Sequence, residues 1–224
     1  MTAHFTPETF AYLRDLADNN SKDWFEANRN RYEAAWKAPA LAFIEALAPE
    51  MEKLDPSLKA QAKINGSLRR INRDVRFSKD KSPYNASLHL VFWAGDHPNR
   101  SPGMHFVIYG GGVGFGAGQW GLQPAQLQTW RDMVVDTVEG PRIIEALDRA
   151  AAVGTRLGEP DLARLPKGYD AEGRAAELLR YKSLVSRTFD GLHDAENLTG
   201  VGAVDWAMDM TRAHLPLLQI ATLL

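Results

Sequence analysis

The sequence predicts an α+β protein, in which an antiparallel β-meander of about four strands is flanked by N-terminal and C-terminal helices. Apolar residues recur at helical spacing up to about residue 54, alternate with polar residues between about 69 and 118, and return to helical spacing afterwards. These two changes of period separate the helical segments from the extended ones. Residues 1–224 contain no internal repeat, low-complexity tract or linker, so we expect a single domain.

The composition is that of an ordinary globular protein, with 45% apolar and 24% charged residues. The absence of cysteine excludes a disulfide scaffold, a thiol nucleophile and cysteine-based zinc or iron–sulfur sites, and it suits a reducing cytosol. The first residues lack the charged start and apolar run of a signal peptide, and no stretch approaches ~18 consecutive apolar residues. We therefore expect a cytoplasmic protein without a membrane segment.

Three helices are expected before the sheet. Thr6 can cap the first helix, and Pro7 suits its first turn. Ser21 caps the second helix, and the third follows Pro39. The aromatic residues of this region recur at the spacing of a buried helical stripe, which favours core packing over a stacking platform for Trp24, Phe25, Tyr32 and Trp36.

The middle of the chain alternates between apolar and polar residues, as strands with one covered face do. The predicted strands cover residues 69–77, 86–93, 104–109 and 112–118. Gly110-Gly111 is a natural two-residue hairpin turn, which sets Phe106 opposite Phe115. The same matching of apolar faces sets Leu90 near Phe106. A shift of register by one residue would expose the apolar face, so only shifts by two are compatible with the pattern.

The second face of the predicted sheet carries polar side chains on its first three strands and only glycines on its fourth strand. Matching the apolar faces of the first two strands places Asp74 near His89. The face then carries Arg70, Asn72, Asp74, Arg76, His89, Trp93, His105 and Tyr109, beside Gly112, Gly114, Gly116 and Gly118. A glycine face indicates close approach by another group, which is either a helix packed flat against it or a ligand.

The last part of the chain is predicted to be mostly helical. Pro124 opens a helix, and Gly140-Pro141 ends it and starts another. Residues 154–170 are rich in turn-forming residues, and 181–186 read as a short strand or extended segment. The final helix is expected at about 203–223, with Pro216 as a kink or restart.

The strongest local signal is a basic stretch. Residues 61–84 contain seven Lys and Arg against two Asp, a local balance of +5 in a chain of net charge −2. Arginine forks suit phosphate or carboxylate groups. We therefore predict an anionic small molecule, most naturally a phosphate-bearing one, as the ligand of Arg70, Arg76, Lys79, Lys81, Tyr84 and Tyr109.

Two other interpretations of the basic stretch stay open. It can be an internal lattice of ion pairs that serves folding alone, with Arg73 pairing with Asp80, because Arg73 falls on the apolar face of the predicted strand. It can also be part of a nucleic-acid-binding module, which the pI near 6.3 makes less favoured.

Asp74, His89 and His105 are the candidate catalytic residues, since the assumed register brings them together and Asp74 can orient His89 for acid–base chemistry. No metal site is predicted, because the six histidines show no local ligand spacing. The glycine-rich run at 110–116 lacks the features of a dinucleotide or P-loop site, and the serine-hydrolase elbow is absent. The pattern suits an enzyme or a binding protein and specifies neither a cofactor nor an oligomeric state.

The basic stretch reads Arg70-Ile71-x-Arg73-Asp74-x-Arg76-Phe77-Ser78-Lys79-Asp80-Lys81-x-Pro83-Tyr84. It resembles the signature of a widespread bacterial family of uncharacterised proteins, the domain of unknown function twenty-four sixty-one. The aromatic N-terminal pattern and the run Leu165-Pro166-x-Gly168-Tyr169 agree with the same family. The resemblance implies a single-domain, soluble, bacterial α+β protein with residues 70–84 as its defining feature, and it implies no activity, substrate or cofactor.

Overall fold

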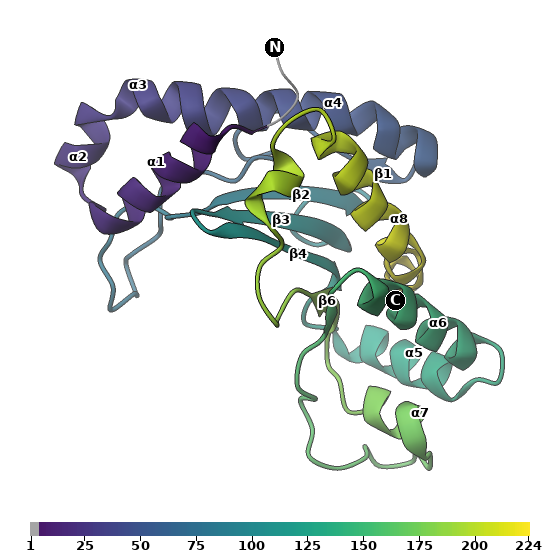
Figure 1. The fold of residues 1–224 in the computed structure, drawn as a ribbon. Coiled ribbons are helices and arrows are strands. Elements are labelled where there is room, and N and C mark those ends of the chain that lie inside the picture. Colours follow the sequence, from purple (N-terminus) through teal and green to yellow (C-terminus); the bar gives the residue numbers. More distant parts are fainter. Residues whose placement is uncertain (1–4) are drawn as a thin grey trace.

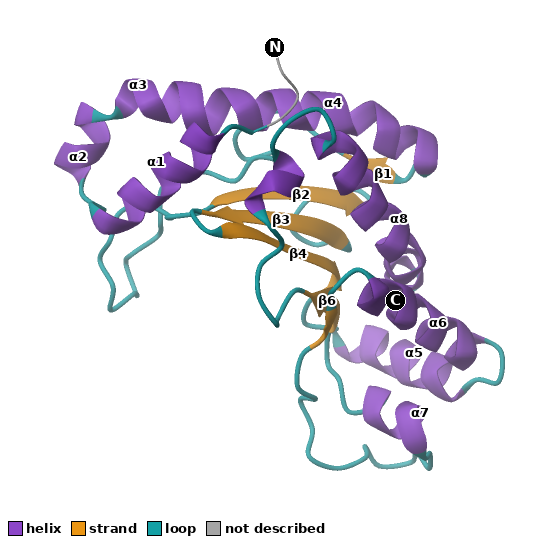
Figure 2. Cartoon of the chain, in the orientation of Figure 1, coloured by secondary structure: helices purple, strands orange, loops and turns teal. Residues whose placement is uncertain are grey.

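The computed structural model describes residues 5–224 and confirms the α+β class. The described residues form an antiparallel sheet of six strands in the order β1-β2-β3-β4-β6-β5, and helices pack against this sheet (Figures 1 and 2). The strands are β1 (Leu58–Lys59), β2 (Leu88–Ala94), β3 (Gly103–Tyr109), β4 (Gly112–Gln119), β5 (Arg156–Leu157) and β6 (Leu184–Arg187). Three of the predicted strands therefore correspond to β2, β3 and β4.

The first two N-terminal helices begin where the capping residues Thr6 and Ser21 predict. The N-terminal helices are α1 (Pro7–Asp18), α2 (Lys22–Ala27), α3 (Arg29–Arg31), the π-helical η1 (Tyr32–Lys37) and α4 (Ala38–Leu54). The backbone N–H of Trp24 donates to Ser21 Oγ at the start of α2. The expected start at Pro39 is wrong, because α4 continues directly from η1. Pro39 follows the π-helical turn, where the regular hydrogen-bond ladder is already interrupted, so its missing N–H does not end the helix.

The later helices are α5 (Pro124–Val135), α6 (Glu139–Ala152), α7 (Gly173–Leu178), the 3₁₀-helical η2 (Ala195–Leu198) and α8 (Ala203–Thr222). Pro216 lies inside α8 and does not divide it. None of the helices in residues 5–224 combines the length and the apolarity that crossing a bilayer requires.

The prediction of a strand at 69–77 is wrong. These residues form no strand, and Asn72 instead forms an isolated bridge with Tyr84 of the same segment. Five of the nine residues at 69–77 are charged, which does not suit a strand inside a sheet. Residues 72–84 therefore fold back on themselves, and the edge of β2 pairs with β1 and with an isolated bridge at Leu68.

The predicted register of the central meander is confirmed. Leu90 lies opposite Phe106, and Phe106 lies opposite Phe115. This apolar face packs against α1, α4 and α8, where the ring of Phe106 lies 6.4 Å from that of Phe43 and 6.1 Å from that of Trp206. The first core therefore lies between the helices and one face of the sheet.

A second core lies where α5, α6 and α7 meet the C-terminal half of α8. Trp130 is fully buried there, and its Nε1–H donates to the carbonyl of Leu178 at 3.2 Å. Figure 1 shows α8 running from the sheet toward α6, so this helix contributes to both cores. The segment that leads to β6 comes from this second core.

Candidate ligand-binding face

Strand pairing sets residues of β3, β4 and β6 in rows across the sheet. His105 lies opposite Gly116, and Gly116 lies opposite Arg187. Residues opposite each other in antiparallel strands project to the same face. The side chains of β3 and β6 therefore stand on either side of a glycine strand, two inter-strand spacings or about 10 Å apart. The result is a trough whose axis follows β4.

The trough contains a pocket of about 290 Å³. The floor of the pocket is formed by Gly103, Gly116 and Gly118. Its walls are formed by His105, Val107, Val185 and Arg187, and Trp120 lies at its rim. The helices of the first core pack against the opposite face of the sheet (Figure 2), so the expected alternative of a helix lying flat on the glycines is wrong for the described residues. The glycine face carries an open pocket instead.

Two glycines of β4 are required because another segment of the chain packs closely against them. Gly118 has a φ of +135°, and a Cβ added there would lie 1.8 Å from the carbonyl oxygen of Leu184. At the other end of β4, a Cβ on Gly112 would lie 2.6 Å from the carbonyl oxygen of His193. Residues 184–193 are therefore one close-approaching group that the glycines accommodate, and the pocket occupies the gap that this segment leaves.

A pair of histidines forms one wall of the pocket. His89 Nε2 and His105 Nδ1 are 2.8 Å apart. Burial lowers the pKa of each ring to about 4; the neighbouring His105 lowers the pKa of His89 further, and the charge of Arg69 lowers both. Both rings are therefore neutral at pH 7, and one donates an N–H to the lone pair of the other. Among residues 5–224 no hydrogen bond uses the second nitrogen of either ring.

The second nitrogen of His105 faces the pocket floor. A Cβ added at Gly103 would lie 3.7 Å from His105 Nε2, so this nitrogen lies over the glycine. It is available to donate or accept a hydrogen bond from a molecule in the trough, because a neutral imidazole can adopt either tautomer.

Arg69 lies behind the histidine pair. Its backbone N–H donates to the carbonyl of His89 at 2.9 Å, so Arg69, and not Asp74 as predicted, is the neighbour of His89. The guanidinium donates to the carbonyl of Pro98 at 3.0 Å and meets no carboxylate of the described chain within 4.0 Å. Burial lowers the pKa of Arg69 below its ordinary value. With Arg70, it also lines an open polar hollow of about 420 Å³ beside the trough.

The aspartates of the basic stretch are engaged with its arginines. Asp74 accepts from the guanidinium of Arg76 at 2.7 Å, so it does not orient His89. Arg73 forms an ion pair with Asp80 and donates to the carbonyl of Ser82. Hydrogen bonds from Ser82, followed by the contact with Arg73, lower the pKa of Asp80 to about 2. These contacts hold the loop at 72–84 together.

The remaining predicted ligand residues do not converge. Lys81 donates to the carbonyl of Val75 within the loop, which Figure 1 shows extending away from the sheet below α2. Tyr84 is buried, and its ring stacks on Phe25 with centroids 4.2 Å apart. Tyr109 lies at the far end of the trough, opposite Gly112. Of the predicted ligand residues, Arg70 alone lines the polar hollow, which Arg73 and Asp74 also line. The predicted catalytic residues His89 and His105 do meet.

Comparison with protein-family models matches residues 8–219 to a family described as conserved hypothetical protein (DUF2461). The chain belongs to the DUF2461 family. A search of curated proteins and a search of solved structures gave no match. The family description states no activity, so the function of this DUF2461 protein has to be inferred from its surfaces.

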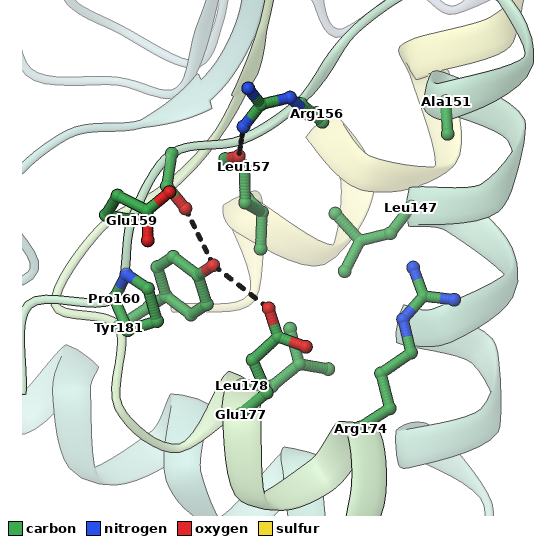
Figure 3. A pocket seen from close by; sticks show the side chains of 11 residues that line it. Leu147, Ala151, Arg156, Leu157, Glu159, Pro160, Arg174, Glu177, Leu178 and Tyr181 are labelled. Carbon is green, nitrogen blue, oxygen red and sulfur yellow. Dashed lines mark hydrogen bonds between the residues drawn. The ribbon is translucent and has the colours of Figure 1, made fainter. Parts of the chain in front are cut away.

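Another pocket of this DUF2461 protein, of about 240 Å³, lies beside α6, α7 and β5 (Figure 3). Arg156 and Arg174 line it, but Arg156 pairs with Asp190 at 3.0 Å and Arg174 pairs with Asp148. The Tyr181 hydroxyl donates to the carbonyl of Gly158 at 2.7 Å. Its arginines are thus already paired, whereas Arg187 in the trough forms no ion pair with a carboxylate among residues 5–224.

Three residues of the trough were missed by sequence reasoning. Trp120 and Val185 gave no motif, and Arg187 lies far from the basic stretch in the chain. The pairing of β4 with β6 brings these residues together, and no local sequence pattern predicts that pairing. Within the described residues, no group of three or more His, Asp or Glu side chains is placed to hold a metal ion.

Proposed function

We propose that this protein binds an anionic small molecule, most naturally one that bears a phosphate, in the glycine-floored trough. The observation that supports the proposal is the row His105–Gly116–Arg187, in which a neutral imidazole and an exposed arginine flank a bare strand. The guanidinium of Arg187 lies 4.5 Å from the ring centroid of Phe189 and pairs with no carboxylate among residues 5–224. Arginine presents a fork of donors that matches phosphate and carboxylate oxygens.

The charges around the trough favour an anion. Arg187 stands on one wall, and Arg69 stands behind the histidine pair on the other. Neither forms an ion pair with a carboxylate in the part of the chain that the structure describes. Two uncompensated positive charges flanking a pocket raise the local concentration of anions and speed their binding. Arg70 and Arg73 line the adjoining hollow together with Asp74, whose carboxylate offsets part of their charge.

Binding is coupled to protonation of the histidine pair. An anion beside His105 offsets the charge of Arg69, which is one of the causes that lower the pKa of both rings. The pKa of the pair therefore rises when the anion binds, and binding strengthens as the pH falls from 7 toward 5.

Isothermal titration calorimetry with inorganic phosphate and with methylphosphonate, at low salt and pH 6, tests the proposal. Arg187→Ala and His105→Gln each lower the affinity about tenfold or more, because each removes a hydrogen bond to a charged group. Arg149→Ala is the matched control, since Arg149 is an exposed arginine on α6 that pairs with Glu145. Absence of binding, or equal affinities for all three variants, contradicts the proposal.

A second candidate function is binding of single-stranded nucleic acid by the loop at 72–84. The Phe77 side chain is 94% exposed, and the guanidinium of Arg76 lies 5.8 Å from its ring centroid. Lys79 and Lys81 lie in the same loop. An exposed ring on which a base stacks, beside cations that contact phosphates, is the arrangement that such binding uses.

Titration of a labelled single-stranded oligonucleotide at rising salt concentration tests this candidate. Phe77→Ala lowers the affinity about fivefold or more by removing the stacking surface. Leu223→Ala, which removes an exposed apolar side chain at the end of α8, leaves the affinity unchanged. Binding that is absent at low salt, or insensitive to salt, excludes the candidate.

A further inference from the structure

We infer that the anion bound in the trough carries a planar aromatic ring, and that this ring lies flat on the glycine floor. The inference rests on the proposed anion site and names the class of molecule that fills it. Three features of the trough carry it, namely its floor, its walls and the indole at its rim.

The floor is bare peptide backbone contributed by two neighbouring strands. Gly103 belongs to β3, and Gly116 and Gly118 belong to β4. A Cβ at Gly116 would project beside the Cβ of Arg187 at 3.0 Å, so any larger residue there would fill the trough from below. A flat group can contact such a floor over its whole face, whereas a puckered or branched group contacts it at a few atoms.

The walls are apolar where the ring would lie and polar where the anion would lie. Val107 and Val185 line the pocket from β3 and β6. Both are half-buried, but they lie in different rows: Val107 is opposite Gly114, whereas Val185 is opposite Gly118, where it offers an apolar contact for a ring edge beside Trp120. Arg187 and His105 stand in the next row of the sheet, so a substituent on the ring reaches them without leaving the floor.

The rim carries an indole that no other aromatic ring covers. Trp120 is 72% exposed, lines this pocket and also lines an adjoining pocket of about 320 Å³. Its ring stacks on no other aromatic ring among residues 5–224, although Tyr181 and Phe189 line the adjoining pocket with it, whereas the rings of the first core pair with one another. Trp120 can stack on or meet the edge of a bound ring, as aromatic pairs prefer.

Three phosphonates with the same anionic head test the inference. Phenylphosphonate is planar, cyclohexylphosphonate has a saturated ring of similar size, and methylphosphonate has no ring. Calorimetry on the full chain is expected to show phenylphosphonate binding about tenfold more tightly than cyclohexylphosphonate. Methylphosphonate is expected to bind most weakly. Equal affinities for the phenyl and cyclohexyl compounds overturn the aromatic inference and leave the anion site standing. Absence of binding by all three overturns the anion site itself.

Two variants place the ring. Trp120→Ala is expected to abolish most of the preference for phenyl over cyclohexyl, while Leu223→Ala, which removes an exposed apolar side chain at the end of α8, retains it. Val185→Trp fills the space beside Gly118 and is expected to block all three compounds. Val135→Trp, at a surface position of α5 that is 43% exposed, leaves their binding unchanged. A phenyl preference that survives both Trp120→Ala and Val185→Trp overturns the placement of the ring in the trough.

Discussion

The histidine pair on the glycine face and the buried His214 of α8 form two networks with nearly the same acidity. Burial is the largest cause that lowers the pKa to about 4 in all three rings. In the interior, His214 Nδ1 donates to the carbonyl of Met210 at 2.8 Å, and its Nε2 lies 2.7 Å from Thr155 Oγ1, which also lies 2.9 Å from the carbonyl oxygen of Ala150. Thr155 in turn contacts Ser186 Oγ at 2.9 Å.

The two networks differ in what they leave available. Both nitrogens of His214 are used and the residue is 0% exposed. In the surface pair one nitrogen of each ring stays unused among the described residues, and His105 presents its own toward a pocket. A lowered pKa thus reports burial in both places. The unused nitrogen beside a pocket, not the pKa, distinguishes a candidate site from a structural network.

The largest expected contrast is in stability. His214→Ala is expected to lower the free energy of unfolding by about 4 kcal/mol, because it leaves a cavity and removes the partner of Thr155. His105→Ala is expected to cost about 1 kcal/mol, since this ring borders an open pocket. Urea denaturation at pH 7 measures both, and equal losses would contradict the distinction between the two networks.

The pH dependence of stability gives the next largest effect. An unfolded chain has a histidine pKa of about 6.5, so between pH 6.5 and 4 the unfolded state binds more protons than the folded state at His214. The free energy of unfolding is therefore not reduced by His214 above pH 6.5, and it falls as the pH decreases below that value. The loss from His214 levels off near pH 4 at about 3 kcal/mol. His214→Gln is expected to make the stability profile less steep between pH 6.5 and 4, with the contributions of His89 and His105 remaining. An unchanged profile would count against a buried, neutral His214.

Removing one hydroxyl isolates the hydrogen bonding of the interior network. Thr155→Val keeps the shape of the side chain but leaves His214 Nε2 and Ser186 Oγ without this partner, which is expected to cost about 2 kcal/mol. Thr129→Val is the matched control, because its hydroxyl only donates to the carbonyl of Ala125 on the exposed side of α5, and its cost is about 0.5 kcal/mol or less. Thermal or urea unfolding of the two variants separates these outcomes.

The smallest effect distinguishes the networks by their response to a ligand. Saturating methylphosphonate is expected to raise the pKa of the His89–His105 pair by about one unit, or about 1.4 kcal/mol. The pKa of His214, which is sealed in the interior, is expected to stay near 4. Titration of the histidine ring signals by NMR, with and without methylphosphonate, measures both. A shift at His214 alone, or at none of the three, would contradict the assignment of the trough.

The sequence predicted the part of the site that depends on neighbouring strands. The hairpin at Gly110-Gly111 fixes the pairing of β3 with β4, and matching apolar faces then brings His89 and His105 to one side of the sheet. It did not predict Arg69 as the neighbour of His89, because the alternation at 69–77 resembles a strand. Charge density and the bridge between Asn72 and Tyr84 turn those residues into a separate loop.

By itself, the sequence determined the α+β class, the central meander with its register and membership in the DUF2461 family. These features follow from local periodicity, capping and short turns. Only the tertiary structure decided that β6 pairs with β4, which places Arg187 across Gly116 from His105 and puts Trp120 at the rim. The physical reason is that a pairing between distant segments depends on loop closure and on burial of the whole chain, which no local pattern encodes.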